Sequence, residues 1–171
     1  ELKVGDTVIK GEDDIEIDGK VYDIKSCSPF AYIHKWHQGY ENLKNDDTFG
    51  YLGQLYGYST AQDKEAGGWI VVDKSSGEVC VVDAKIHGQE KQRLKQVVED
   101  TVATISEGRP FKRCFEAEDD KFKATSTGLK RLSISCSFCD FVKVCWPTAE
   151  YKPHPHSKAK KPPYYWFVTE E

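Results

Sequence analysis

The sequence contains no apolar run that approaches the length of a membrane-spanning helix, and no signal peptide is visible. On these grounds we expect a soluble, intracellular protein of the cytoplasm. No internal repeat is present either. With 171 residues, of which 39% are hydrophobic and 12% aromatic, the chain is long enough to bury one substantial core with an appended segment.

Basic residues are fewer than acidic ones, and the formal net charge is −4. A negative chain is a poor match for nucleic acid, but the charge is unevenly distributed. Residues 1–108 contain 12 basic and 20 acidic side chains, a net charge of −8, whereas residues 109–161 contain 12 and 6, a net charge of +6. Attraction to phosphate is therefore expected mainly from the C-terminal part. Scattered lysines that only keep a surface soluble are the alternative.

The segment Gly11–Lys25 is the most informative part of the chain, because it predicts a β-hairpin with charged residues at defined positions. Asp18 and Gly19 lie between two apolar-rich flanks, and both residue types tolerate the positive φ that a type I′ turn needs. Such a turn places Ile17 opposite Lys20 and so fixes the register of the hairpin.

Counting outward from this turn places Asp14 directly across from Asp23, with Lys25 on the same face as Asp23. Like charges directly opposite one another destabilise a strand pair. A divalent cation between the carboxylates would remove that penalty, since hard cations such as Mg²⁺ take oxygen ligands. An ordinary acidic edge hairpin with solvated carboxylates is the alternative. The opposite face is expected to belong to the core and carries Ile15, Ile17, Tyr22 and Ile24.

The remaining pattern alternates between short strands and helices. Ser28-Pro29 predicts a helix start, and Asp46 or Asp47 can cap a second helix that carries Gln54 and Tyr58. The other expected elements are strands near 4–17, 20–26, 69–73 and 78–82 and an amphipathic helix over 88–107. This order predicts an α/β protein.

The hairpin resembles the PD-(D/E)XK nuclease superfamily, in its RecB-like exonuclease branch. In that branch a strand with a Gly-x-x-Asp pattern pairs with a strand that ends in Asp-x-Lys-Ser, and Gly11–Asp14 and Asp23–Ser26 match. A Gln-x-x-x-Tyr motif follows on the next helix, as do Gln54 and Tyr58 here. Residues four apart share one helix face, so both can point to the same edge of the sheet. A helix that uses tyrosine as core filler is the alternative.

The resemblance implies a role for each matching residue. Asp14 and Asp23 would ligate Mg²⁺ or Mn²⁺ together with the main-chain carbonyl of Ile24. Lys25 would orient or help deprotonate the attacking water, while the glutamine and tyrosine of the helix motif would position the DNA backbone. Many relatives add an Arg, His or Glu from helices that precede the first catalytic strand. Here that strand lies almost at the start of the sequence, and local substitutes are Glu12 and Glu16.

The resemblance also implies a function and a fold. We expect a metal-dependent DNA exonuclease, rather than an endonuclease, that acts on a free or single-stranded end in phage or prokaryotic recombination, repair or processing. A viral member would act in the host cytoplasm. The expected fold is a restriction-endonuclease-like mixed sheet flanked by helices, divided into a nuclease core (1–108), a cysteine-rich metal-binding segment (109–150) and a basic, aromatic tail (151–171). A non-catalytic DNA-binding module and a zinc-ribbon interaction protein are the alternatives.

The cysteines form the second pattern. Cys136, Cys139 and Cys145 are closely spaced, with Cys114 upstream, and soft thiolates at such spacing suit zinc or an iron–sulfur cluster. Six cysteines in an intracellular chain favour metal over disulfides. The triplet is similar to the C-terminal cysteines of RecB-like nucleases, including CRISPR-associated and bacteriophage-encoded members, which commonly bind a 4Fe–4S cluster. Their fourth cysteine often precedes the nuclease core, whereas Cys114 follows it and is the expected fourth ligand.

The C-terminal tail offers two further interpretations. His154 and His156 are an alternative complement to three cysteines in a zinc site. The basic residues Lys158, Lys160 and Lys161 precede an aromatic run, and cations beside aromatic rings suit single-stranded nucleic acid through phosphate contact and base stacking. A proline-rich strap that packs its aromatic side chains onto the body of the protein is the alternative.

Overall fold

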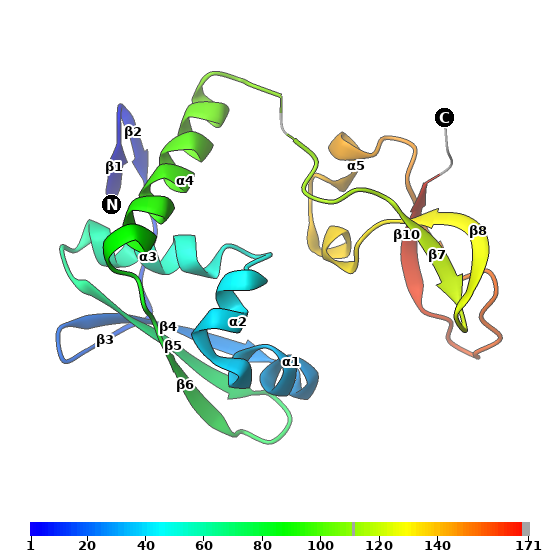
Figure 1. The fold of residues 1–171 in the computed structure, drawn as a ribbon, viewed down its shortest axis with the longest axis horizontal. Coiled ribbons are helices and arrows are strands. Elements are labelled where there is room, and N and C mark those ends of the chain that lie inside the picture. The colour runs from blue at the N-terminus through cyan, green and yellow to red at the C-terminus, as the bar shows by residue number, and fades with distance from the viewer. Residues whose placement is uncertain (111, 169–171) are drawn as a thin grey trace. The chain divides into compact units, whose positions relative to one another are not determined.

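The structure is a computed structural model that describes residues 1–110 and 112–168. The chain divides into two compact units, Glu1–Arg109 and Pro110–Glu171, and the elements of both appear in Figure 1. Strands and helices occur in each unit, so the protein belongs to the mixed α/β class. Within the described residues, no helix is both long enough and apolar enough to cross a membrane.

The first unit is organised around a mixed four-stranded sheet with the strand order β3-β4-β5-β6. Its strands are β3 (Ile15–Ile17), β4 (Lys20–Cys27), β5 (Glu65–Asp73) and β6 (Val79–Asp83). The β4–β5 pair is parallel, and the other two pairs are antiparallel. Parallel neighbours need a crossover connection, and the helical segment between β4 and β5 supplies it.

Two helices of this crossover, the first and the last, begin where the sequence predicts. The crossover contains α1 (Pro29–His34), the 3₁₀ turn η1 (Trp36–Gln38), α2 (Gly39–Asn45) and α3 (Tyr51–Ala61). The hydroxyl of Ser28 accepts a hydrogen bond from the amide of Ala31 at the start of α1. The Asp47 carboxylate accepts from the first two amides of α3, at 2.7 and 3.1 Å. Helix α4 (Gly88–Ser106) follows β6 and confirms the amphipathic helix expected there.

The crossover helices cover one face of the sheet (Figure 1), and the core lies between these helices and the sheet. Its completely buried side chains are Val21, Leu43, Leu52, Leu55, Trp69 and Val71. The predicted core face of the hairpin is wrong, because the other face of β4 packs against the helices. Ile15, Ile17 and Ile24 are 37–45% exposed, and Tyr22 is half-buried.

The expected long first strand is interrupted. Residues before the β3–β4 hairpin form a small separate hairpin of β1 (Leu2–Val4) and β2 (Thr7–Ile9), with Gly5 at a φ of +57° in its turn. Glycine adopts this left-handed conformation without a steric penalty. The strand predicted near 4–17 is therefore interrupted, with the short strands β2 and β3 joined by residues 10–14 outside regular structure.

The second unit has its own antiparallel sheet, with the strand order β7-β8-β10-β9. Its strands are β7 (Glu118–Phe122), β8 (Thr125–Arg131), β9 (Glu150–Pro153) and β10 (Tyr164–Val168), and two short helical elements connect β8 to β9: η2 (Ile134–Phe138) and α5 (Val142–Cys145). A separate small core is formed by Leu132, Cys136, Val142, Ala149 and Val168. Residues 151–168 therefore supply strands to this sheet rather than trailing from it.

Candidate active site

The β3–β4 hairpin has the predicted register. Ile17 pairs with Lys20, and the turn residues Asp18 and Gly19 have φ values of +50° and +75°, as a type I′ turn requires. The ladder ends at the pair formed by Ile15 with Tyr22. One residue further out, the register brings Asp14 opposite Asp23 at the point where β3 begins.

Asp14 is anchored to the main chain of β4. Its Oδ2 accepts a hydrogen bond of 2.7 Å from the amide of Ile24. Because the amide and carbonyl of one residue in a strand point to the same side, the Ile24 carbonyl is directed toward this same edge. No β3 residue pairs with it there, since the ladder has already ended. The Ile24 carbonyl is therefore directed to the edge at which Asp14 is bound, and the Asp14 carboxylate also lies near that of Asp23.

Asp23 is the buried member of this group, with 2% of its surface exposed. Burial is the main cause that raises its pKa, the nearby Asp14 carboxylate raises it further, and Lys25 acts in the opposite direction. Lys25 Nζ lies 2.9 Å from Oδ1 and 2.8 Å from Oδ2, yet Oδ2 receives no hydrogen bond of acceptable geometry. An additional cation would therefore stabilise the ionised form of Asp23.

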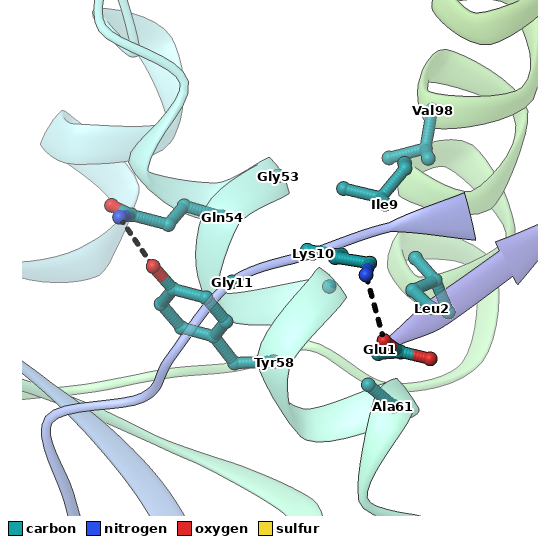
Figure 2. A pocket seen from close by; sticks show the side chains of 11 residues that line it. Glu1, Leu2, Ile9, Lys10, Gly11, Gly53, Gln54, Tyr58, Ala61 and Val98 are labelled. Carbon is teal, nitrogen blue, oxygen red and sulfur yellow. Dashed lines mark hydrogen bonds and ion pairs between the residues drawn. The ribbon is translucent and has the colours of Figure 1, made fainter. Parts of the chain in front are cut away.

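Lys25 connects the carboxylates to helix α3. Its ammonium donates a hydrogen bond of 2.9 Å to Gln54 Oε1, and Gln54 Nε2 donates one of 3.0 Å to the hydroxyl of Tyr58, as Figure 2 shows for the second contact. The four-residue spacing places both side chains on one helix face, as predicted. One continuous set of interacting side chains thus contains Asp14, Asp23, Lys25, Gln54 and Tyr58.

Two further residues shape this set. A Cβ atom on Gly11 would lie 2.8 Å from Cε1 of Tyr58, so glycine lets the segment before β3 pass directly against the tyrosine ring (Figure 2). Tyr51, one turn before Gln54 on α3, places its ring 5.4 Å from Lys25 Nζ, a distance suited to a cation–π contact. Burial raises the pKa of Tyr51, so its phenol stays neutral. Tyr51 was not singled out from the sequence, although its three-residue spacing from Gln54 was a usable signal.

The outer side of Gln54 and Tyr58 borders a cavity of about 220 Å³. Its walls are mostly apolar and come from the N-terminal hairpin, α3 and α4, as Figure 2 shows. The local substitutes expected from the sequence do not join the site. Glu16 is paired with Lys64, and Glu12 is exposed without a described contact to the carboxylate pair.

The oxygen donors fit a hard divalent cation. Mg²⁺ is usually bound by one or two carboxylates together with water and substrate phosphate, and Asp14, Asp23 and the Ile24 carbonyl supply such a set. Oδ2 of Asp23 is buried and contacts only the Lys25 ammonium, without a hydrogen bond of good geometry, so it can accept a further cationic partner.

The four expected cysteine ligands are neighbours in the second unit. Burial raises the pKa of the Cys136 thiol, and Cys139, Cys145 and Cys114 raise it further through their charges. Within residues 1–110 and 112–168, however, no three His, Cys, Asp or Glu side chains are arranged to hold a metal ion. The thiols therefore have the donor chemistry of a zinc or iron–sulfur site without its coordination geometry.

His154 faces a carboxylate rather than the cysteines. It is buried, and its Nε2 lies 3.0 Å from Oδ2 of the completely buried Asp120. Thr127 donates to the same oxygen at 2.7 Å, and Arg131 lies 3.3 Å from the other oxygen. A buried charge needs such partners, which gives His154 a structural role in this unit.

The predicted phosphate-binding lysines occupy the connection between β9 and β10, and all three are exposed: Lys158, Lys160 and Lys161. A scan against protein-family models, a search of curated proteins and a search of solved structures all give no match. The interpretation of the site therefore depends on its own geometry.

Proposed function

We propose that Glu1–Arg109 is a nuclease core of the PD-(D/E)XK type, with a restriction-endonuclease-like sheet, that hydrolyses DNA with Mg²⁺ or Mn²⁺. One observation supports this most strongly: four side chains from two distant motifs are joined by hydrogen bonds, Asp23 to Lys25, Lys25 to Gln54 and Gln54 to Tyr58, and the Asp14 carboxylate lies near that of Asp23. A tyrosine-rich core helix and an acidic edge hairpin would have no reason to meet in this way. The expected preference is for a free DNA end, and the expected setting is phage or prokaryotic DNA processing.

The mechanism assigns each residue a task that its contacts permit. Asp14, Asp23 and the Ile24 carbonyl would hold the divalent cation at the end of β3. When bound, the cation supplies a water of lowered pKa and neutralises charge on the scissile phosphate. Lys25 is 21% exposed, so its ammonium can reach substrate and counter the charge that develops there.

Gln54 and Tyr58 have a positioning role in this mechanism. Gln54 accepts from Lys25 and donates to Tyr58, so its amide cannot turn without breaking one of the two bonds. This arrangement keeps the ammonium of Lys25 directed toward Asp23. The Tyr58 hydroxyl still has its own proton to donate, which suits a phosphate oxygen of the DNA backbone.

For the second unit we propose a structural zinc ion or 4Fe–4S cluster held by Cys114, Cys136, Cys139 and Cys145. The support is the soft donor set and the mutual influence of the four thiols. Because they do not have coordination geometry, metal binding would have to rearrange the segment, as in sites where binding and folding are coupled. Elemental analysis of protein purified without oxygen distinguishes zinc, iron with sulfide, and neither.

Digestion of end-labelled linear DNA and closed circular DNA with Mg²⁺ tests the nuclease proposal. An exonuclease degrades the linear substrate and leaves the circle intact. Asp23→Asn should abolish cleavage while preserving side-chain shape, and Asp83→Asn, an exposed position at the end of β6, is the matched control and should cleave normally. Equal cleavage by Asp23→Asn and the wild type would exclude this site.

A further inference from the structure

The sheet of the second unit carries an aromatic face. Trp166 on β10 pairs directly with Tyr151 on β9, so the two side chains lie on the same side of the sheet. Tyr164 lies two residues before Trp166 and shares that side. The ring centroids are 5.2 Å apart for Tyr151 and Trp166 and 5.5 Å apart for Tyr151 and Tyr164. We refer to Tyr151, Tyr164 and Trp166 as the aromatic face.

The aromatic face is both exposed and rigidly supported. Tyr151 is 51% and Tyr164 50% exposed, whereas Trp166 packs against the core of the unit. The other side of the same strand is occupied internally, because Phe167 is buried and contacts His154. Two tyrosine rings thus stand in solvent on a base that the core holds in place.

Basic side chains adjoin this face in the structure and in the sequence. Lys143 Nζ lies 5.4 Å from the centre of the Trp166 ring, and Glu150 on β9 is already paired with Lys152. The connection between the two aromatic strands carries Lys158, Lys160 and Lys161. None of these three makes an ion pair with a residue in the described ranges 1–110 and 112–168, so their charges remain available for an anionic partner.

We propose that the aromatic face binds single-stranded nucleic acid. Unpaired bases would stack on Tyr151 and Tyr164, while phosphates would contact the lysines of the β9–β10 connection. Stacking platforms flanked by cations bind single strands with little dependence on sequence, because every base has a π-face. Bases within a duplex are stacked on each other and cannot use such a platform. This inference is independent of the candidate active site, which belongs to the other unit.

Binding by the whole chain to labelled oligo-dT, oligo-rU and a duplex of equal length tests the proposal. EDTA in the buffer prevents hydrolysis, so the outcome does not depend on the nuclease proposal. We expect fluorescence anisotropy of the labelled strands to show tighter binding of the single strands than of the duplex. Tighter binding of oligo-dT than of oligo-rU would identify DNA as the preferred single strand, and the opposite order would identify RNA.

Variants separate stacking from charge. Tyr151→Ala and Tyr164→Ala should each weaken single-strand binding about tenfold, a loss within the range measured for removal of a stacking ring. The corresponding Tyr→Phe variants should bind as the wild type does. Phe30→Ala, which removes a 73% exposed ring of the first unit, is the control. Lys160→Ala should lower the magnitude of the salt slope by about 0.7.

Three outcomes would overturn the proposal. They are absence of single-strand binding, duplex binding that is equal or tighter, and unchanged affinity of the double variant Tyr151→Ala/Tyr164→Ala. A circular dichroism melt of each variant shows whether the second unit is still folded. If an alanine variant unfolds, the preference of the wild-type chain for single strands over the duplex and the smaller salt slope of Lys160→Ala still test the proposal, and equal or tighter duplex binding still overturns it.

Discussion

The substitution Asp23→Asn should affect stability in opposite directions with and without a divalent cation. The pKa of Asp23 is raised by burial and by Asp14 more than Lys25 lowers it, so the folded protein binds a proton at this carboxylate more readily than the unfolded chain does. The raised pKa of Asp23 stabilises the folded state by its full amount below the ordinary aspartate pKa. This stabilisation is lost as the pH rises through the raised pKa of Asp23. At neutral pH the ionised Asp23 is therefore a net cost, which a neutral asparagine of the same shape removes.

The size of the effect follows from the cross-strand arrangement. Like charges directly opposite in a strand pair destabilise it by up to about 1 kcal/mol, and the 2% exposure of Asp23 leaves little screening by solvent. Without metal, Asp23→Asn should thus raise the free energy of unfolding by about 1 kcal/mol. A cation that binds the folded wild type adds about 2.7 kcal/mol at a concentration one hundred times its Kd. In excess Mg²⁺ the wild type should therefore be more stable than Asp23→Asn, which is the reverse of their order without metal.

Urea denaturation at neutral pH, in EDTA and in excess Mg²⁺, measures both free energies. The difference between wild type and Asp23→Asn should also shrink in EDTA as the pH falls toward the ordinary aspartate pKa, because the wild-type carboxylate becomes protonated. Asp83→Asn should follow the wild type under every condition. The reasoning is refuted if Mg²⁺ stabilises Asp23→Asn as much as wild type, or if the variant is clearly less stable in EDTA.

Three further predictions address other parts of the structure. Lys25→Ala should lower kcat by about a hundredfold with little change in DNA affinity, and single-turnover assays that instead show lost binding would make Lys25 an anchoring cation. Gly11→Ala should displace the Tyr58 ring, given the 2.8 Å approach, and cost about 1–3 kcal/mol of stability, whereas an unchanged melt and unchanged activity would show that the ring moves freely. Cys139→Ser should lose bound zinc or iron and several kcal/mol of stability, measured by elemental analysis and thermal melts; metal-free wild type with the same melting temperature as the variant would contradict this.

Local signals predicted the parts of the fold that local chemistry determines. The Asp18-Gly19 turn fixed the hairpin register because its positive φ values restrict the connection to one geometry. Ser28 and Asp47 marked two helix starts because their side chains satisfy free amides. Such arguments need only neighbouring residues.

Long-range packing decided what the sequence left open. Both faces of β4 carry apolar side chains, and the buried face is the one with Val21 because the helices pack on that side against Trp69. An isoleucine-rich pattern could not reveal this. The strands β7 and β8 were missed because their connecting turn uses Lys123 and Ala124 at positive φ, residue types that give no turn signal. The interaction of Lys25 with Gln54 was predictable only through the resemblance.

The division of the candidate site between a hairpin and a crossover helix has a kinetic consequence. A hairpin forms in about 1–10 μs, so Asp14 and Asp23 can meet early during folding. Lys25 and Gln54 are 29 residues apart in the chain, and their contact must wait until the crossover closes and β4 pairs with β5 in parallel. Non-local pairings of this kind form slowly. Between these two events, Asp14 and Asp23 are in register while Lys25 does not yet contact Gln54. Substitutions in the turn should therefore change the folding rate, and substitutions of Gln54 should change mainly the unfolding rate.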